Sequence, residues 1–175
     1  MPLPDRLYID SQRMGRVFMS DGEYVRRVLA MEKRLYRVAQ AMLWREADCL
    51  DAVQEAVFRG WTQKGRLRDE ARFEHWLMRI LVNQCREMLR RRKREPAGLP
   101  ENVSETKDLC TDLHLRQALQ NLPEKYRLPL VLHHVEGYAV AEVADMLDIP
   151  RKLTVSRLHQ ARKALRDLLD GGDRR

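Results

Sequence analysis

Residues 136–169 read EGYAVAEVADMLDIPRKLTVSRLHQARKALRDLL, and this stretch decides the fold. The apolar residues of its first part recur at the three- and four-residue spacing of one helix face: Val140, Val143, Ala144 and Leu147. Pro150 then interrupts the helix, because proline disfavours helical geometry in its predecessor and is best placed at a helix start. A second helix with Leu158, Ala161 and Leu165 on one face follows at once.

The second of these helices has a basic outer face. Its remaining positions carry Arg151, Lys152, Val155, Ser156, His159 and Arg162. Two short helices joined by a turn of about four residues, the second of them basic, predict a helix-turn-helix that binds DNA. The alternative interpretation is an ordinary pair of antiparallel helices with a solvated basic face.

Charge is unevenly distributed along the 175 residues, which carry a net charge of +7. Residues 1–94 hold 21 basic and 13 acidic side chains, residues 95–112 hold 1 and 5, and residues 113–175 hold 11 and 8. Two basic lobes therefore flank an acidic connector, which indicates two contacts with a polyanion. We predict an all-α protein with two small helical domains, a helical bundle and a helix-turn-helix, joined by a flexible acidic linker.

Three amphipathic helices are predicted in the first lobe. The first begins at the cap-like pair Ser20-Asp21, and its expected core face is Val25, Val28, Leu29, Leu35, Val38, Ala39, Met42 and Leu43. The second runs from about 47 to 62, with Leu50, Val53, Val57 and Trp61 inward. After a loop at Gly65, the third begins with Phe73, Trp76, Leu77, Ile80, Leu81 and Gln84.

The third helix closes on a basic run that contains Arg90, Arg91, Arg92, Lys93 and Arg94. Cations at a helix C-terminus favour the helix dipole, which explains some of them. The run contains more cations than the helix dipole explains, so contact with phosphates is the more specific interpretation. Phe73 and Trp76 have the chemistry to stack on bases, but aromatics at this spacing more often pack in a core.

The second lobe follows a linker at residues 95–112, where two prolines, a glycine and no helical period occur. Helices are expected at Leu113–Leu119 and from Pro123 onward, where proline suits the first helical position. The expected core face of the latter is Leu128, Val131, Leu132 and Val135, and Pro129 should kink it. The predicted boundaries are an extension at 1–21, domains at 22–94 and 113–170, the linker, and a tail at 171–175.

Several classes of function are excluded by what the residues lack. Cys49, Cys85 and Cys110 are odd in number and widely spaced, and His133-His134 has no further ligand nearby, so no metal site is expected. No P-loop or HExxH spacing occurs, and we expect neither an enzyme nor a cofactor. No apolar run reaches the roughly 20 residues of a membrane span and no signal peptide is present, so we expect a cytoplasmic protein without membrane insertion.

Several motifs occur together in the order of a known family. EADCLDAVQEAVFRGW, FEHWLMRILVNQCREMLRRRKR, LPEKYRLPLVLHHVEGYAVAEVADMLDIP and SRLHQARKAL resemble segments of bacterial RNA polymerase sigma factors of the sigma-70 superfamily. The resemblance is to the extracytoplasmic-function (ECF) group, which keeps regions two and four. It covers about residues 22–94 and 113–169, with Glu87 where the family usually has Asp.

The resemblance implies three sets of contacts. The clamp of the largest subunit of core RNA polymerase would bind Asp48, Asp51, Gln54, Glu55 and Arg59. The promoter −10 element would be captured and melted by Arg66, Arg68, Trp76, Arg79, Asn83, Arg86, Arg90, Arg91 and Arg94. The −35 element would be read by Arg151, Lys152, Val155, Ser156, Arg157, His159, Arg162 and Lys163.

Further partners follow from the same resemblance. The second lobe would also meet the flap of the second-largest polymerase subunit, and the acidic linker would thread the RNA channel. An anti-sigma factor and a role in a stress or envelope response are expected as well. The runner-up hypothesis is a stand-alone helix-turn-helix regulator that uses the first lobe for dimerisation, and the third is a nucleic-acid enzyme.

The chain departs from the family pattern at residues 152–155. The usual I-P-x-G-T-V-K-S-R-L is replaced by Ile149-Pro150-Arg151-Lys152-Leu153-Thr154-Val155-Ser156-Arg157-Leu158. Thr154 falls where the family buries Val, and Val155 replaces a DNA-facing Lys, so it can touch a thymine methyl but cannot pair with phosphate. Ala139 also lacks the side-chain cap that Ser or Thr would provide. We expect the fold to survive these changes and the −35 specificity to differ.

Overall fold

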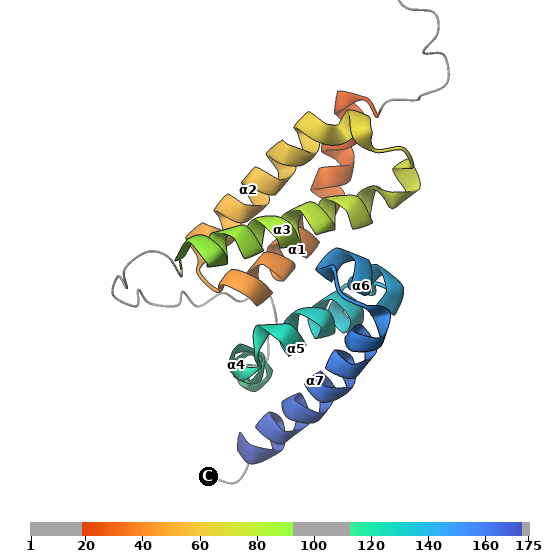
Figure 1. The fold of residues 1–175 in the computed structure, drawn as a ribbon. Coiled ribbons are helices and arrows are strands. Elements are labelled where there is room, and N and C mark those ends of the chain that lie inside the picture. Colours follow the sequence, from red (N-terminus) through yellow and green to blue (C-terminus); the bar gives the residue numbers. More distant parts are fainter. Residues whose placement is uncertain (1–18, 93–112, 173–175) are drawn as a thin grey trace, which may run out of the picture.

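The computed structural model describes residues 19–92 and 113–172, which form helices and no strands (Figure 1). The first lobe consists of α1 (Asp21–Leu43), α2 (Glu46–Gln63), two short 3-10 turns η2 (Lys64–Arg66) and η3 (Glu70–Arg72), and α3 (Phe73–Arg92). The second lobe consists of α4 (Leu113–Asn121), α5 (Glu124–Leu130), a π-helical segment η4 (Val131–Val135), α6 (Val140–Leu147) and α7 (Arg151–Gly172). The all-α, two-lobed prediction is confirmed. The predicted linker at 95–112 and residues 1–18 lie outside the described residues.

The start of α1 is the one that the sequence predicts. The Ser20 hydroxyl accepts a hydrogen bond from the Glu23 amide at 3.2 Å. It thereby gives a partner to one of the backbone amides that have none within the first turn of a helix. The helix ends at Leu43, and the left-handed backbone of its C-cap Trp44 (φ 64°) turns the chain into α2. Met19, which precedes the predicted boundary at residue 22, is buried in the core of the first lobe.

The predicted core face of the first two helices is partly wrong. Val25 and Leu29 of α1 are exposed, with 63% of Leu29 accessible, and Leu50 of α2 is exposed as well. The buried side of α2 is instead Cys49, Ala52, Ala56 and Gly60. Small side chains let α2 approach both α1 and α3 closely: a Cβ at Gly60 would collide with the Tyr24 hydroxyl. The side of α2 that packs in the core is therefore the one with small side chains, because it allows the closest approach of the neighbouring helices. The larger Leu50 stays exposed.

The core of α3 follows the prediction more closely. Phe73, Leu77, Leu81 and Gln84 are buried, and Trp76 and Ile80 are partly buried against the core. The ring of Phe73 meets that of Tyr24 edge to face at 5.6 Å, which joins the starts of α1 and α3. The predicted loop at Gly65 is the η2 turn.

The second lobe changes helix type where proline intervenes. Pro129 lies inside α5, and the helix continues from Val131 in π geometry to its end at Val135. Leu128, Val131 and Leu132 are buried as predicted, but Val135 is exposed, because the wider π turn rotates it away from the expected face. Pro123 is the N-cap of α5 rather than its first residue.

The helix-turn-helix consists of α6 and α7. Asp148 adopts the left-handed conformation (φ 53°) that ends α6, and α7 starts directly after Pro150. Ala139 has no capping side chain, and the Glu142 carboxylate accepts the Ala139 amide instead, at 2.8 Å. Thr154 is fully buried, as its register predicts, and its hydroxyl donates to the Pro150 carbonyl at 3.3 Å.

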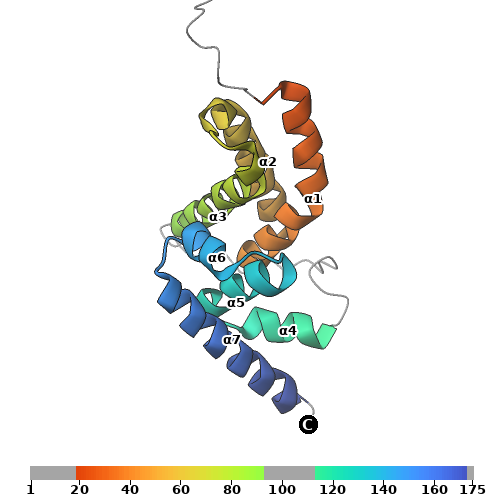
Figure 2. The ribbon, with the colours of Figure 1, turned by 90° about the vertical axis from the view of Figure 1, so that its right-hand side faces the viewer.

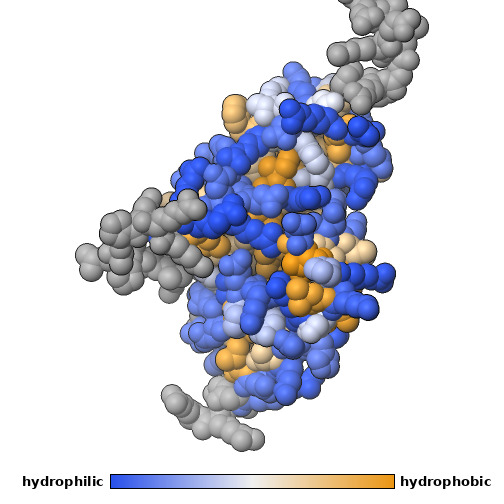
Figure 3. Space-filling view, in the orientation of Figure 1, coloured by the Kyte–Doolittle hydropathy of each residue, from blue (hydrophilic) through white to orange (hydrophobic). Residues whose placement is uncertain are grey.

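The two lobes pack against each other. Helix α6 lies on α3 and α5 lies on α1, as the two perpendicular views show (Figures 1 and 2). Hydrophilic side chains cover most of the face drawn in Figure 3, and the hydrophobic surface on it is confined to small areas. One hydrophobic core cluster extends through both lobes, and charged groups, described with the candidate site, add further contacts between them.

Candidate functional site

An acidic and aromatic surface lies on the outer side of α2. Asp51 and Gln54 are exposed, and beside them Phe58 leaves 63% of its surface in solvent. With Glu55, Arg59, Gln84, Met88 and Arg91 these residues line an open groove of about 540 Å³ between α2 and α3. Phe58 was missed by sequence reasoning, although its place one turn beyond Gln54 was the available signal. An exposed phenylalanine among acids is suited to a protein partner.

Salt bridges within and between α2 and α3 connect the charged groups of this surface. Glu55 accepts from Arg59 at 2.6 Å, and Arg59 also reaches Glu87 of α3 at 3.2 Å. Asp48 pairs with Arg92, and Glu87 pairs with Arg91. One predicted polymerase-binding acid, Asp48, is therefore neutralised by a cation of the basic run, Arg92. The bonds from Arg91 and Arg59 hold the pKa of Glu87 below its usual value.

Two members of the basic run have different surroundings. Arg90 is exposed, and no ion pair is recorded for it with the described residues. Arg94, the last predicted member, lies outside the described part of the chain. Arg90 is thus the described cation of this run that is available to a phosphate without breaking an internal pair.

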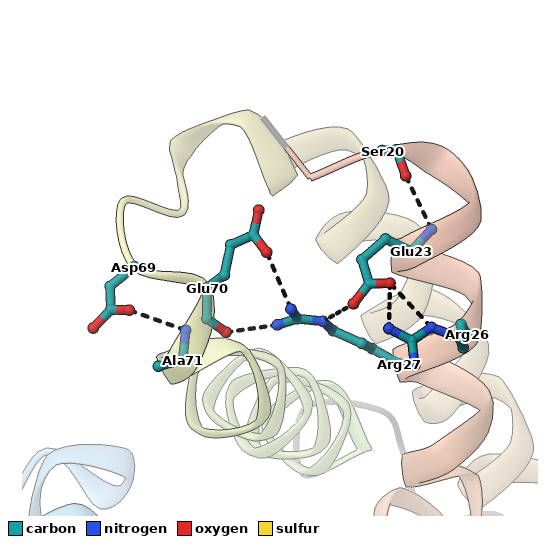
Figure 4. Close-up of polar contacts among 7 residues, drawn as sticks. All are labelled: Ser20, Glu23, Arg26, Arg27, Asp69, Glu70 and Ala71. Atoms are coloured by element: carbon teal, nitrogen blue, oxygen red, sulfur yellow. Dashed lines mark hydrogen bonds and ion pairs between the residues drawn. The ribbon is translucent and has the colours of Figure 1, made fainter. Parts of the chain in front are cut away.

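The loop before α3 is fixed to α1 by an arginine that sequence reasoning missed. Arg27 donates to the Glu70 carbonyl at 2.7 Å and to the Glu70 carboxylate at 3.0 Å, and it also pairs with Glu23 (Figure 4). The Asp69 carboxylate accepts the Ala71 amide at 2.9 Å, which shapes the turn. Arg66 and Arg68, predicted to capture the −10 element, are exposed in the preceding segment.

The remaining predicted −10 residues lie along α3. Arg79 and Asn83 are exposed, and Trp76 is half-buried with its ring 6.0 Å from that of Phe73, as the core interpretation predicts. Arg86 is half-buried and, with Arg157 of α7, lines a pocket of about 210 Å³ between the lobes. Burial lowers the pKa of Arg86 below its usual value, and the nearby Arg157 adds to this effect.

The first turns of α7 present the predicted −35 residues. Arg151, Lys152, Val155, Ser156, His159, Arg162 and Lys163 are exposed, and Arg157 is half-buried. Val155 leaves 52% of its surface in solvent, and Leu153, which was not predicted as a site residue, is exposed beside it. The helix thus presents apolar groups among cations.

Two carboxylates of the second lobe bind cations of the first. Glu136 accepts from Arg34 at 3.0 Å and from Arg37 at 2.8 Å. Asp145 of α6 lies 2.6 Å from the Nε2 atom of His75 and 3.4 Å from Arg79. These pairs were not predicted, since their members are far apart in the sequence.

Arg127 is a buried cation with carbonyl partners. It donates to the carbonyls of Leu119, Gln120 and Leu122 in its own lobe and to that of Ala41 in α1 at 2.6 Å. Its guanidinium also lies 4.7 Å from the centre of the Trp44 ring. Burial lowers the pKa of Arg127 below its usual value.

The remaining features bear on metals, thiols and membranes. Cys49 and Cys85 are free and buried, and burial raises the pKa of each thiol to about 12; Cys110 lies outside the described residues. Among residues 19–92 and 113–172, no three metal-binding side chains gather. None of the helices in those ranges is long and apolar enough to cross a membrane.

Comparison with known proteins gives matches in both lobes. The family model for sigma-70 region 2 matches residues 28–95, and that for sigma-70 region 4 matches residues 113–165. The ECF RNA polymerase sigma factor SigM of Mycobacterium tuberculosis is 33% identical over 141 residues, which cover 78% of this chain and 72% of SigM. The ECF RNA polymerase sigma factor SigW of Bacillus subtilis is 27% identical over 157 residues, which cover 78% of this chain and 83% of SigW.

Two solved structures share the fold. Sigma factor RpoE from Bartonella quintana, solved in complex with the anti-sigma factor NepR, matches with a TM-score of 0.71 and 20% identity over 85% of this chain and 97% of that chain. CnrH, solved in complex with the cytosolic domain of CnrY, matches with a TM-score of 0.68 and 24% identity over 87% of this chain and 90% of that chain.

Proposed function

This chain belongs to the ECF RNA polymerase sigma factors, and from that premise we propose that it binds core RNA polymerase and directs it to promoters. The observation that carries the proposal is the order of the two lobes, an acidic helix α2 followed by a helix-turn-helix at α6 and α7. The test is co-purification with core polymerase, followed by transcription from a cognate promoter. A chain that fails to bind core polymerase would refute the proposal.

The surface on α2 is the proposed polymerase contact. Asp51, Gln54 and Glu55 would bind the clamp of the largest subunit, with Asp48 and Arg59 at the margins of the contact. Phe58 at its centre adds apolar area that becomes buried on binding, which is the usual arrangement of an interface core with a polar rim.

The loop before α3 and the exposed side of α3 are the proposed −10 reader. Arg66 and Arg68 extend from the loop that Arg27 fixes, and Arg79, Asn83 and Arg86 follow along the helix. Strand opening here would hold unstacked bases and bind the backbone with cations, and it needs no covalent chemistry. Trp76 is half-buried, so its share in this contact would be limited to the exposed part of its ring.

The basic run at the end of α3 gives a quantitative prediction. Replacing Arg90, Arg91 and Arg92 with alanine should weaken promoter binding and reduce the slope of log K against log salt by roughly one to three, since each phosphate contact contributes roughly one. Promoter affinity of the holoenzyme measured across a salt series checks this. Lys33→Ala in α1 is the control, because it removes an exposed cation that belongs to none of the proposed contacts. An unchanged slope in the triple variant would contradict the assignment.

The start of α7 is the proposed −35 reader, in which Lys152, Ser156 and Arg157 would be joined by Val155. An exposed valine in such a helix has a thymine methyl as its natural partner. We expect a −35 element with deoxyuracil in place of thymine at the contacted position to bind about fourfold more weakly, the worth of one buried carbon at ~0.8 kcal/mol. Val155→Ser should bind both elements equally. Equal binding of both by the unaltered protein would exclude the methyl contact.

The partners beyond DNA and the clamp are also proposals. The flap of the second-largest subunit would meet the second lobe. An anti-sigma factor would mask the polymerase-binding surfaces, a proposal supported by the two solved relatives, both determined in complexes. A chain that directs core RNA polymerase to promoters would itself act in the cytoplasm. The stand-alone regulator remains the contrasting hypothesis, and it predicts tight, two-fold-symmetric operator binding without polymerase, which a gel shift measures.

A further inference from the structure

The packing of the lobes brings together residues proposed to read different promoter elements. Arg86 of α3 is assigned to the −10 element and Arg157 of α7 to the −35 element, yet both line the same pocket of about 210 Å³. Elements centred at −10 and −35 lie about 25 base pairs apart, which is roughly 85 Å of duplex at 3.4 Å per base pair. The arrangement in the structure therefore cannot place both residues on their own elements.

A carboxylate of the second lobe, that of Asp145, also forms an ion pair with Arg79, a cation proposed to bind DNA. Both oxygens of Asp145 lie 3.4 Å from Arg79 Nη1, and Oδ2 lies 2.6 Å from His75 one turn earlier. The hydrogen bond from His75 lowers the pKa of Asp145, with a smaller contribution from Arg79, so this group stays charged. Asp145 thus lies against one nitrogen of the Arg79 guanidinium and partly neutralises the charge that a promoter phosphate would bind.

A second contact between the lobes is more deeply buried. The Glu136 side chain is only 1% exposed, and both of its carboxylate oxygens accept hydrogen bonds from arginines of α1. Arg34 also donates to the Glu136 carbonyl and lies 5.2 Å from the centre of the Tyr138 ring. The partners Arg34 and Arg37 each keep about a quarter of their side chain in solvent, so they regain hydration easily when the lobes separate.

We infer that Glu136 and Asp145 form a polar latch that, beside the apolar contacts between the lobes and the bond from Arg127 to Ala41, favours a self-inhibited, closed arrangement of the free chain. In this arrangement α6 covers part of the −10-reading side of α3, and the two readers are too close together to engage one promoter. Polymerase or promoter DNA must break the latch, and phosphates compete directly with Asp145 for Arg79. The inhibitory consequence rests on the proposed function, whereas the latch itself is a property of the chain alone.

The test uses the purified full chain without polymerase. The variants are Glu136→Gln, Asp145→Asn and the double substitution, and the matched control is Asp167→Asn, which removes one exposed acid of α7 with no recorded ion pair to a described residue. Small-angle X-ray scattering reports the separation of the lobes, and circular dichroism checks that both remain folded. Binding to a single-stranded −10 oligonucleotide reports access to α3.

The double variant is expected to have a larger radius of gyration and to shift the closed-to-open ratio by roughly tenfold or more, as the loss of charge-assisted hydrogen bonds implies. Affinity for the oligonucleotide should rise by up to the same factor, because apparent affinity scales with the competent fraction. The control should match the unaltered protein. If Glu136→Gln unfolds the second lobe, Arg37→Gln removes the same pair from the side of the first lobe.

Three results would overturn the inference. The first is a radius of gyration that does not change in the folded double variant, and the second is an unaltered chain that is already open at low salt. The third is an opened variant whose oligonucleotide affinity is unchanged, which would remove the inhibitory role. Failure to bind core polymerase would instead count against the proposed function, since the scattering measurement does not depend on it.

Discussion

Replacing Asp51 with arginine is expected to abolish assembly with core RNA polymerase while leaving the fold intact. Asp51 is exposed on α2, lines the groove beside Phe58, and has no recorded ion pair with the described residues. Reversal of its charge costs no internal contact, but it sets a cation against a surface that matches an anion. Like charges brought together at an interface cost several kcal/mol, so affinity should fall by about two orders of magnitude or more.

The measurement is an affinity titration of the chain against core polymerase, with the melting temperature recorded alongside. Glu32→Arg is the matched control, because Glu32 is an exposed acid of the same lobe, on α1, away from the groove. We expect the control to assemble normally and both variants to melt as the unaltered protein does. Normal assembly of the Asp51 variant would show that this face of α2 does not bind polymerase.

Replacing Arg127 with alanine is expected to destabilise the second lobe by about 3–5 kcal/mol. The substitution leaves several buried carbonyls without a donor, in the α4–α5 turn and at Ala41 of α1, and it removes the contact with Trp44. The net stability of a small domain is only about 5–15 kcal/mol, so much of it would be lost. Urea unfolding followed by circular dichroism measures the change.

Lysine at the same position separates charge from geometry. A lysine keeps the charge, but its single ammonium group cannot reach carbonyls that a planar guanidinium bonds on several sides, so Arg127→Lys should also be strongly destabilising. Arg166→Ala, at an exposed position of α7, is the control and should change stability by about 0.5 kcal/mol or less. A lysine variant as stable as the unaltered protein would mean that burial of the charge alone matters here.

Local features of the fold could be predicted from the sequence, because their signals lie within a few residues. The Ser20 cap, the break at Pro150 and the burial of Thr154 each follow from chemistry that acts over one or two turns. The buried face of α2 could not be predicted in the same way. Cys49, Ala52, Ala56 and Gly60 carry little hydrophobic weight, and their burial depends on how closely α1 and α3 approach.

Contacts between distant segments were the other feature beyond sequence reasoning. Nothing about Glu136 in isolation distinguishes an acid that binds two arginines of α1 from an acid in solvent. The same holds for Arg27, whose role in fixing the loop at Glu70 depends on a neighbour more than forty residues away. Exposed candidates such as Asp51 and Val155 could be identified in advance, since exposure follows from helical periodicity.

The cross-linking of α2 to the end of α3 makes two binding events thermodynamically interdependent. Arg92 is held by Asp48, and Arg91 is held by Glu87, which also binds Arg59 of α2. A protein partner that takes over Asp48 releases Arg92 for phosphate, and a phosphate that takes over Arg92 releases Asp48 for the protein partner. Because such coupling is reciprocal, occupancy of either surface raises the affinity of the other by the same factor.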